Sequence, residues 1–377
     1  MKREELAFLE LLKSGLWNSP IDTAFFSPRV DWSKILRMSE EQSVVGIITD
    51  GISQLPKKYH GDRPVMLQFF ARTMTVEDEN KRMNRFIPKL MEQLERHGVH
   101  SLLLKGQGVS LCYRQPLHRM LGDIDLLITN EEEYRKARSL MHLIAEEYGE
   151  EDEGRKHSAF LYKGMLVEIH GNFRFYINRQ CRNNVQKWKI SRLSSPSRFI
   201  ENEHLKGVAL PPVQFDVLFI FAHLIHHYIG GASIGLRQVS DWMMFLIQNK
   251  DAIDNATLEN DLDCLGLRKY WRVFGAMAVN WLGFPKEMMP LYDGNETSKG
   301  TIVLENIFKI GDSYSDLCKT QTTVLAPTFF KKLSSFWGQI PMFARNLKVF
   351  PADTIWYFKQ FIISSMRGYK TQELTEE

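Results

Sequence analysis

The segment from Leu102 to Ile128 constrains the fold of this chain more than any other. It begins with a short apolar run, passes through a Lys-Gly dipeptide into an amphipathic stretch, and ends with Asp123, Ile, Asp125 and three further apolar residues. The apolar runs are typical of short strands, and the stretch between them predicts a helix over residues 107–114. This order fits a small sheet with helices packed on it.

Asp123 and Asp125 lie two positions apart on a predicted strand over residues 123–128. Because strand side chains alternate, both carboxylates should lie on one face and could grip one divalent ion, while the intervening apolar residues lie on the other. Oxygen ligands favour Mg²⁺ or Mn²⁺, and Mg²⁺ commonly accompanies nucleotide phosphates. We therefore expect a buried apolar face and an acidic face open to a cleft.

A third carboxylate, Glu168, lies in another predicted strand over residues 165–171. Its neighbours are apolar, so it should lie on the opposite face, where the sheet could place it beside the first two carboxylates. Three carboxylates suit a site with two metal ions roughly 3.5–4 Å apart, which would activate an attacking oxygen and neutralise a leaving pyrophosphate. The alternative is an exposed residue paired with Lys163 or Arg174.

The Lys-Gly dipeptide has the properties of a phosphate-binding turn. Gly106 can adopt positive φ and let backbone N–H groups approach an anion, and the helix predicted over 107–114 would direct its N-terminal dipole at that anion. Lys105 and Arg119 would add positive charge, and arginine offers a planar fork to phosphate oxygens.

Together these residues resemble the polymerase-beta-type nucleotidyltransferase superfamily. The resemblance rests on Lys105-Gly106, Tyr113, Pro116, Arg119, Asp123-Ile124-Asp125 and the later strand acid, within about residues 85–175. The spacing is most similar to that of a poorly characterised bacterial group with the pattern Leu-Lys-Gly, a short helix ending in Tyr, Arg, then Asp-Ile-Asp-Leu-Leu.

The resemblance implies roles for seven residues. The cofactor-binding residues would be Lys105, Gly106, Gln107 and Arg119, and the catalytic metal ligands would be Asp123, Asp125 and Glu168. Two positions depart from the superfamily pattern: Gln107 replaces the small second residue of the usual turn, and Glu168 stands where Asp is more frequent.

Length and helical spacing indicate several regions. The chain has 377 residues, of which 44% are hydrophobic, so it can bury more than one core. We expect an α+β fold, with a small mixed-sheet nucleotidyltransferase core between helical N-terminal and C-terminal regions. The expected divisions are a helical N-terminal region (1–84), the catalytic core (85–185), a linker rich in Ser, Pro, Asn and Gly (186–212), and a helical C-terminal domain (213–377). The further predicted elements are helices at 3–17, 32–54, 63–97 and 131–147 and a strand at 158–163.

The net charge and the cysteine content limit which binding partners and which cellular compartment the sequence predicts. The net charge of +3 is too small to argue for nucleic acid as an obligatory partner, and the four cysteines lack the paired spacing of a zinc motif. Scattered cysteines indicate free thiols in a reducing compartment. The N-terminal segment is predicted to be an amphipathic helix and not a secretory signal, and no apolar run approaches the roughly 20 residues of a membrane span. We therefore expect a cytoplasmic protein with access to NTP.

Three histidines, His223, His226 and His227, recur on one face of a predicted helix at 213–228. A zinc peptidase would need a Glu between paired histidines, and none is present. These side chains could reach the cleft and contact nucleotide or acceptor, or could be buried and hydrogen-bonded within a helical core. A following helix at about 236–247 carries Asp241.

The segment from Phe329 to Lys370 is rich in aromatic and basic residues. A basic amphipathic helix of this kind can lie on an anionic membrane surface or dock a partner. Alternatively, its aromatic side chains pack on the helical domain while its charges face water.

The sequence thus predicts a metal-dependent nucleotidyltransferase that moves a nucleoside monophosphate from an NTP to an acceptor hydroxyl and releases pyrophosphate, with Mg²⁺ or Mn²⁺ as cofactor. Glu168 is the candidate to bind the catalytic metal and help deprotonate the acceptor. One alternative is a non-catalytic nucleotide-binding module of the same fold, favoured by the departures at Gln107 and Glu168. Another is a peripheral membrane or complex-assembly protein that acts through the aromatic and basic C-terminal segment. No motif identifies the acceptor or the preferred nucleotide.

Overall fold

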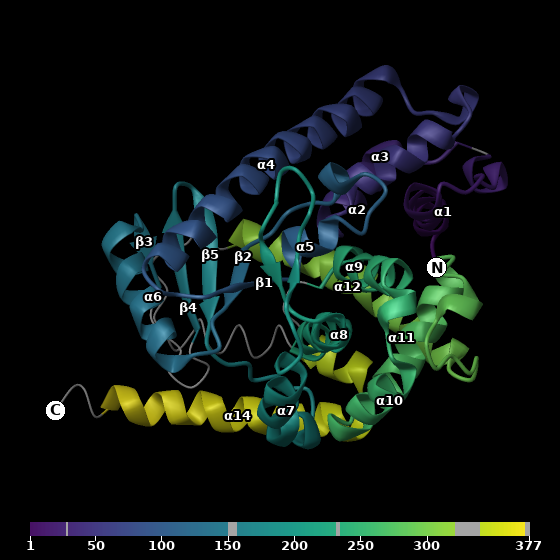
Figure 1. The fold of residues 1–377 in the computed structure, drawn as a ribbon. Coiled ribbons are helices and arrows are strands. Elements are labelled where there is room, and N and C mark those ends of the chain that lie inside the picture. The colour runs from purple at the N-terminus through teal and green to yellow at the C-terminus, as the bar shows by residue number, and fades with distance from the viewer. Residues whose placement is uncertain (28, 150–156, 231–233, 321–339, 374–377) are drawn as a thin grey trace.

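The computed structural model describes residues 1–27, 29–149, 157–230, 234–320 and 340–373, leaving aside the side chains of 310–320 and 364–373. The chain folds into a mixed α+β structure, with helical regions before and after a five-stranded sheet (Figure 1). The predicted fold class is therefore confirmed.

Helices form the N-terminal region. They are α1 (Arg3–Trp17), α2 (Trp32–Glu41), α3 (Val45–Gln54) and the 34-residue α4 (Arg63–Arg96), with 3-10 turns η1 (Thr23–Phe26) and η2 (Lys57–Tyr59). The single helix predicted over 32–54 is wrong, because the chain reverses between α2 and α3 at Ser43, whose φ is 56°. Neither Gly nor Pro marks that break. Gly98 follows the C-cap of α4 and has a φ of 70°, a left-handed conformation in which glycine commonly ends a helix.

The sheet is built from five strands with helices between them. The elements in chain order are β1 (Leu102–Leu104), α5 (Gly106–Ser110), η3 (Pro116–His118), β2 (Ile124–Leu127), α6 (Glu131–Ile144), β3 (Glu147–Tyr148), β4 (His157–Tyr162) and β5 (Met165–His170). The helix predicted over 107–114 has only five residues, too few for a strong N-terminal dipole. The segment predicted as a linker holds the end of α7 (Arg179–Leu193) and the two-stranded sheet of β6 (Arg198–Phe199) and β7 (Ala209–Leu210).

The order of the main sheet is β1-β2-β5-β4-β3. Strands β2 and β5 are parallel, and their register pairs Asp125 with Glu168. Strands β4 and β5 are antiparallel, and their register pairs His157 with His170. Because side chains directly opposite each other share a face, the two registers collect acidic and imidazole groups on one side of the sheet centre.

The C-terminal region is helical. It contains α8 (Val213–Gly230), α9 (Leu236–Gln248), η4 (Lys250–Ala252), α10 (Asn255–Cys264), α11 (Arg268–Trp281), η5 (Lys286–Met288), α12 (Thr297–Thr320) and α14 (Pro351–Glu373). Its core is rich in aromatic side chains: Phe221 packs against both Trp242 and Trp271, with ring centroids 5.0 and 4.8 Å away.

Helix α4 connects the two hydrophobic cores. Its N-terminal half buries Met66 and Phe69 in the core shared with the helical regions. Its C-terminal half buries Ile87 and Leu94 against the sheet. In Figure 1 the helix accordingly runs from α2 and α3 to the sheet. Burying different segments in two cores fixes the sheet relative to the N-terminal helices.

Parts of the predicted aromatic and basic C-terminal segment lie outside the described residues, including Phe336 and Trp337. Phe343 and Phe350 are buried, with 6% and 4% of their surface exposed. Phe350 packs against Tyr270 of α11, as the alternative interpretation of the segment expects, whereas Phe343 packs against Phe358 of α14 within the segment itself. Within the described ranges, no helix combines the length and apolar character that crossing a membrane requires.

Candidate functional site

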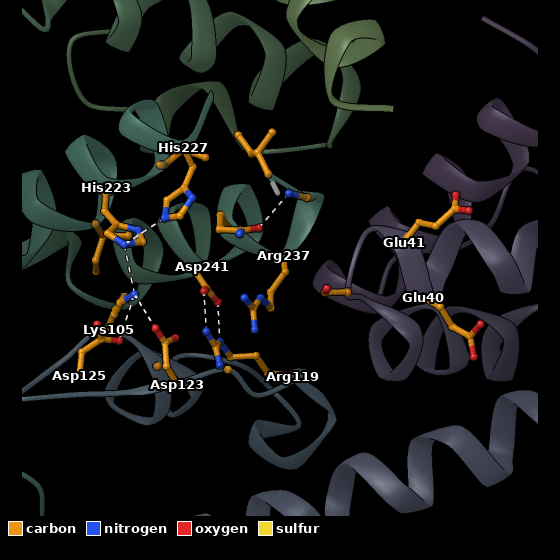
Figure 2. A pocket seen from close by; sticks show the side chains of 18 residues that line it. Glu40, Glu41, Lys105, Arg119, Asp123, Asp125, His223, His227, Arg237 and Asp241 are labelled. Carbon is orange, nitrogen blue, oxygen red and sulfur yellow. Dashed lines mark hydrogen bonds and ion pairs between the residues drawn. The ribbon is translucent and has the colours of Figure 1, made fainter. Parts of the chain in front are cut away.

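Two pockets meet at Asp125, which lines both of them. The first has a volume of about 390 Å³ and is bounded by α2, the turn after β1, β2, α8 and α9 (Figure 2). The second has a volume of about 660 Å³ and is bounded by β4, β5, the segment after β5, α8 and α14. His223 and His227 of α8 also line both pockets. A molecule in either pocket can therefore reach Asp125 from its own side.

The three predicted carboxylates come together at this junction. Asp123, Asp125 and Glu168 each offer an oxygen, and these atoms all lie within 4.8 Å of one another. The parallel register of β2 and β5 places Asp125 next to Glu168, and Asp123 directly precedes β2. The expectation of an open acidic face is wrong for Asp125, because its side chain is only 2% exposed, whereas that of Asp123 is 29% exposed.

Lys105 lies beside two of the three carboxylates. Its Nζ lies 3.0 Å from Oδ2 of Asp125 and 3.8 Å from Oδ2 of Asp123, and it donates a hydrogen bond of 3.1 Å to Nε2 of His223. Figure 2 shows the ammonium between the aspartates on one side and the histidine on the other. Burial lowers the pKa of Lys105, but the two aspartates outweigh that effect and raise it.

The turn after β1 has two successive residues with positive φ. Gly106 has a φ of 49° and Lys105 a φ of 40°. A positive φ at a lysine is unfavourable, and such strain is often found at functional sites. The strained turn directs the Lys105 side chain at Asp125.

Two histidines that the sequence analysis had not singled out complete the acidic group. His170 donates a hydrogen bond of 2.9 Å from Nε2 to Oδ1 of Asp125, and the same atom lies 3.5 Å from Oε2 of Glu168. Nε2 of His157 lies 3.1 Å from that Oε2. Burial lowers the pKa of His170, but its bonds to Asp125 and Glu168 raise it to about 9. Burial raises the pKa of Glu168, but the two imidazoles lower it overall.

The negative charge of Asp123 is offset by neighbouring positive groups less fully than the charge of Glu168 is. Burial and the neighbouring charge of Asp125 raise its pKa, and Lys105 only partly offsets them. Three carboxylates within 4.8 Å, with the repulsion between Asp123 and Asp125 only partly relieved by Lys105, form a donor set that fits a divalent cation. The residues able to hold such an ion are Asp123, Asp125 and Glu168.

Arg119 lines the first pocket, but its guanidinium is hydrogen-bonded to another side chain of the protein, that of Asp241. Nε and Nη2 each donate a hydrogen bond of 2.7 Å to the carboxylate of Asp241 on α9. The hydroxyl of Tyr113 donates a further bond of 2.8 Å to Asp241. This buried group joins the loop before β2 to the C-terminal helices, so Arg119 positions the loop that carries Asp123.

Gln107 faces away from the pocket. Its side chain is 2% exposed, and its Nε2 donates to Oδ1 of Asn80 at 3.1 Å and to Oδ1 of Asn84 at 2.6 Å. Nδ2 of Asn80 in turn donates to the carbonyls of Leu117 and Arg119, at 2.8 and 2.9 Å. The longer residue at this position therefore anchors the turn to α4.

A cation that the sequence analysis missed, Arg237 of α9, also lines the first pocket. Its Nη1 donates to the carbonyls of Met120 and Leu121, at 3.2 and 2.7 Å, and among the described residues its Nε is buried without a hydrogen-bond partner. Burial lowers its pKa, and the nearby Arg119 charge adds to that effect. In the sequence, Arg237 precedes Asp241 by four positions on a predicted helix, so the two side chains lie on the same helical face. That spacing could have indicated that Arg237 lies near the site.

All three histidines of the predicted face of α8 line the second pocket, and His223 and His227 also line the first. His223 contacts Lys105, and its Nε2 lies 3.3 Å from Nε2 of His227. Burial and the positive charge of Lys105 hold the pKa of His223 well below its usual value. The third, His226, accepts a hydrogen bond of 3.3 Å from the backbone N–H of Tyr176. His223 therefore accepts a hydrogen bond from the Lys105 ammonium.

Comparison with known proteins identifies a family for this chain. A family model described as "Uncharacterised nucleotidyltransferase" matches residues 28–283, more than half of the chain. No curated protein and no solved structure matches the chain. The matched range contains the carboxylate group, the turn at Lys105, and the helices α8 and α9 that enclose the first pocket.

Proposed function

The chain belongs to this family of uncharacterised nucleotidyltransferases, and we propose that it moves a nucleoside monophosphate from an NTP to an acceptor hydroxyl with release of pyrophosphate. The proposed cofactor is Mg²⁺ or Mn²⁺, and the proposed superfamily is the polymerase-beta type. The observation that carries this proposal is the convergence of Asp123, Asp125 and Glu168 within 4.8 Å, beside the strained turn at Lys105.

The first pocket is the proposed NTP site. Lys105 and Gly106 line it together with Asp123, and Arg237 contributes a guanidinium whose Nε makes no hydrogen bond among the described residues. A buried cation with a spare donor favours an anionic ligand such as a triphosphate. Arg119 would act mainly by holding the loop before β2 in place, because Nε and Nη2 of its guanidinium are already hydrogen-bonded to Asp241.

The second pocket is the proposed acceptor site, because Glu168 lies in it and Asp123 does not. Its walls include Phe173, Phe219 and Tyr357. Its size is within the range of small-molecule sites, which span roughly 300–1,000 Å³. Among the described residues, Arg174 is the only lysine or arginine that lines it, so the pocket offers few permanent cations to a polyanionic acceptor.

The residues divide the chemistry between the two pockets. The acceptor oxygen forms a bond to the α-phosphorus, the bond from that phosphorus to the pyrophosphate oxygen breaks, and the hydroxyl proton leaves on the acceptor side. Divalent ions, when bound, would activate the acceptor oxygen and neutralise the leaving pyrophosphate. Glu168, kept ionised by its histidine partners, would hold the acceptor-side ion and help to deprotonate the hydroxyl. Lys105 and Arg237 would hold the triphosphate.

The test is label transfer from each α-labelled NTP with Mg²⁺ or Mn²⁺, using cell extract as acceptor source. We expect transfer by the wild-type protein and loss of about 10²-fold or more in Asp123→Asn and Asp125→Asn. Lys250→Met is a matched control on the exposed surface. Retained transfer in both aspartate variants would refute the mechanism, and metal-dependent NTP binding without transfer would favour the non-catalytic nucleotide-binding module.

A further inference from the structure

A second group of ligand atoms adjoins the carboxylates. His157, Glu168 and His170 each offer an atom, and these atoms lie within 4.8 Å of one another. Oε2 of Glu168 lies 3.1 Å from Nε2 of His157 and 3.5 Å from Nε2 of His170. Glu168 is therefore shared between an oxygen-only group and a group with two imidazoles.

Strand geometry explains why the imidazoles meet. His157 and His170 are directly opposite in the antiparallel register of β4 and β5. Glu168 precedes His170 by two positions on β5, so all three side chains lie on one face of the sheet. The imidazole rings of His157 and His170 are close, with centroids 4.8 Å apart. Ligands on paired strands are held more rigidly than ligands on loops.

The two groups differ in the metals that they favour. Carboxylate oxygens suit Mg²⁺ and Mn²⁺, whereas imidazole nitrogens suit later transition metals, whose affinity for mixed nitrogen and oxygen sites exceeds that of Mg²⁺. Two imidazoles and one carboxylate that leave positions open form a common set for a transition-metal ion. The second pocket, which these three residues line, gives such an ion an entry path.

We propose that His157, Glu168 and His170 bind a divalent transition-metal ion, so that the acceptor side of the site selects a different metal from the NTP side. This inference rests on the proposed function only in that Glu168 serves both groups. The competing interpretation is a set of ion pairs in which protonated histidines neutralise Glu168 and no metal binds at the imidazoles.

The first experiment is titration of the metal-free full chain with Co²⁺, followed by visible absorption and calorimetry. We expect the absorption bands of Co²⁺ with nitrogen ligands, displacement by Zn²⁺ and retention in excess Mg²⁺. His157→Ala should weaken Co²⁺ binding tenfold or more, because one of three ligands is lost. Its side chain is 28% exposed at the edge of the group, which favours retention of the fold. Near-ultraviolet circular dichroism checks the fold.

Asp123→Asn is the matched control, because Asp123 belongs to the oxygen-only group alone. It should keep the Co²⁺ bands while losing Mg²⁺-dependent transfer. Absence of the bands in the wild-type protein, or bands of equal strength in His157→Ala, would overturn the inference even if transfer is observed. Co²⁺ bands that depend on His157 in a protein without transfer would support the inference and overturn the proposed function.

Discussion

Asp241 on α9 accepts two hydrogen bonds of 2.7 Å from Arg119, which precedes it by 122 residues in the chain. The pair joins the loop that leads to Asp123 with the C-terminal helices. Both side chains are buried: that of Arg119 is 4% exposed and that of Asp241 is 9% exposed. The carboxylate site therefore depends on the helical region for its geometry, and the two regions cannot be treated as independent.

The first prediction concerns this pair. Asp241→Asn keeps the size of the side chain but leaves the Arg119 charge buried without a counter-charge. We expect the free energy of unfolding to fall by about 3–5 kcal/mol in urea denaturation. The control is Glu131→Gln, whose exposed pair with Arg135 has a distance of 2.6 Å and should contribute less than about 1 kcal/mol. Equal losses in the two variants would show that burial does not govern the Arg119 pair.

The sequence predicted those features that depend on the local pattern of apolar and polar residues. The face on which Glu168 lies followed from side-chain alternation, because its neighbours Val167 and Ile169 are buried on the other face of β5. The long helix α4 followed from helical spacing. The face of a strand and the length of a helix depend on residues within a few positions of one another, which a single sequence displays.

What the sequence did not predict depends on long-range packing. His157 meets Glu168 only through the pairing of β4 with β5, and Arg237 enters the pocket only because α9 packs against the loop before β2. The break at Ser43 gives a further example, since α3 then packs against α1 so closely that a Cβ on Gly51 would lie 2.2 Å from the carbonyl oxygen of Leu11. No local propensity encodes these contacts.

The second prediction concerns Gln107. In Gln107→Leu, the buried Oδ1 atoms of Asn80 and Asn84 lose the amide that donates to both. We expect the free energy of unfolding to fall by about 1–3 kcal/mol, with NTP affinity changed less than about threefold because the side chain does not line the first pocket. Gln115→Leu, at an exposed position, is the control and should stay within about 0.5 kcal/mol. A large loss of NTP affinity with unchanged stability would instead place Gln107 at the phosphates.

The third prediction concerns pH. His118 contacts Oδ1 of Asp50 on α3 at 2.8 Å and Oε1 of Glu77 on α4 at 3.0 Å. The hydrogen bond to Asp50 raises the pKa of His118 above its ordinary value of 6.5, although burial opposes the shift. A raised pKa in the folded state means that the stabilisation is fully present below pH 6.5 and is lost as pH rises through the folded-state value.

The corresponding measurement is the free energy of unfolding of wild-type protein and His118→Gln between pH 6 and pH 9. The wild-type advantage should be largest at the acidic end and should shrink as pH rises. Asp50→Asn should reduce the same pH dependence, because it removes the main cause of the shift. An advantage that stays constant across this range would show that the His118 contacts do not depend on its charge.

The last prediction concerns Lys105 and metal binding. Its ammonium lies 3.0 Å from Asp125 and 3.8 Å from Asp123, so it compensates the carboxylates that divalent ions would otherwise occupy. In Lys105→Met, the carboxylates lose this cation, so the melting temperature in EDTA should fall. Added Mn²⁺ should then raise it more than in the wild-type protein, because the ion no longer competes with the lysine. Transfer should fall about 10²-fold or more if Lys105 also holds the triphosphate. With Lys250→Met as surface control, a smaller Mn²⁺-induced rise in Lys105→Met than in the wild-type protein would mean that lysine and metal do not compete for Asp123 and Asp125.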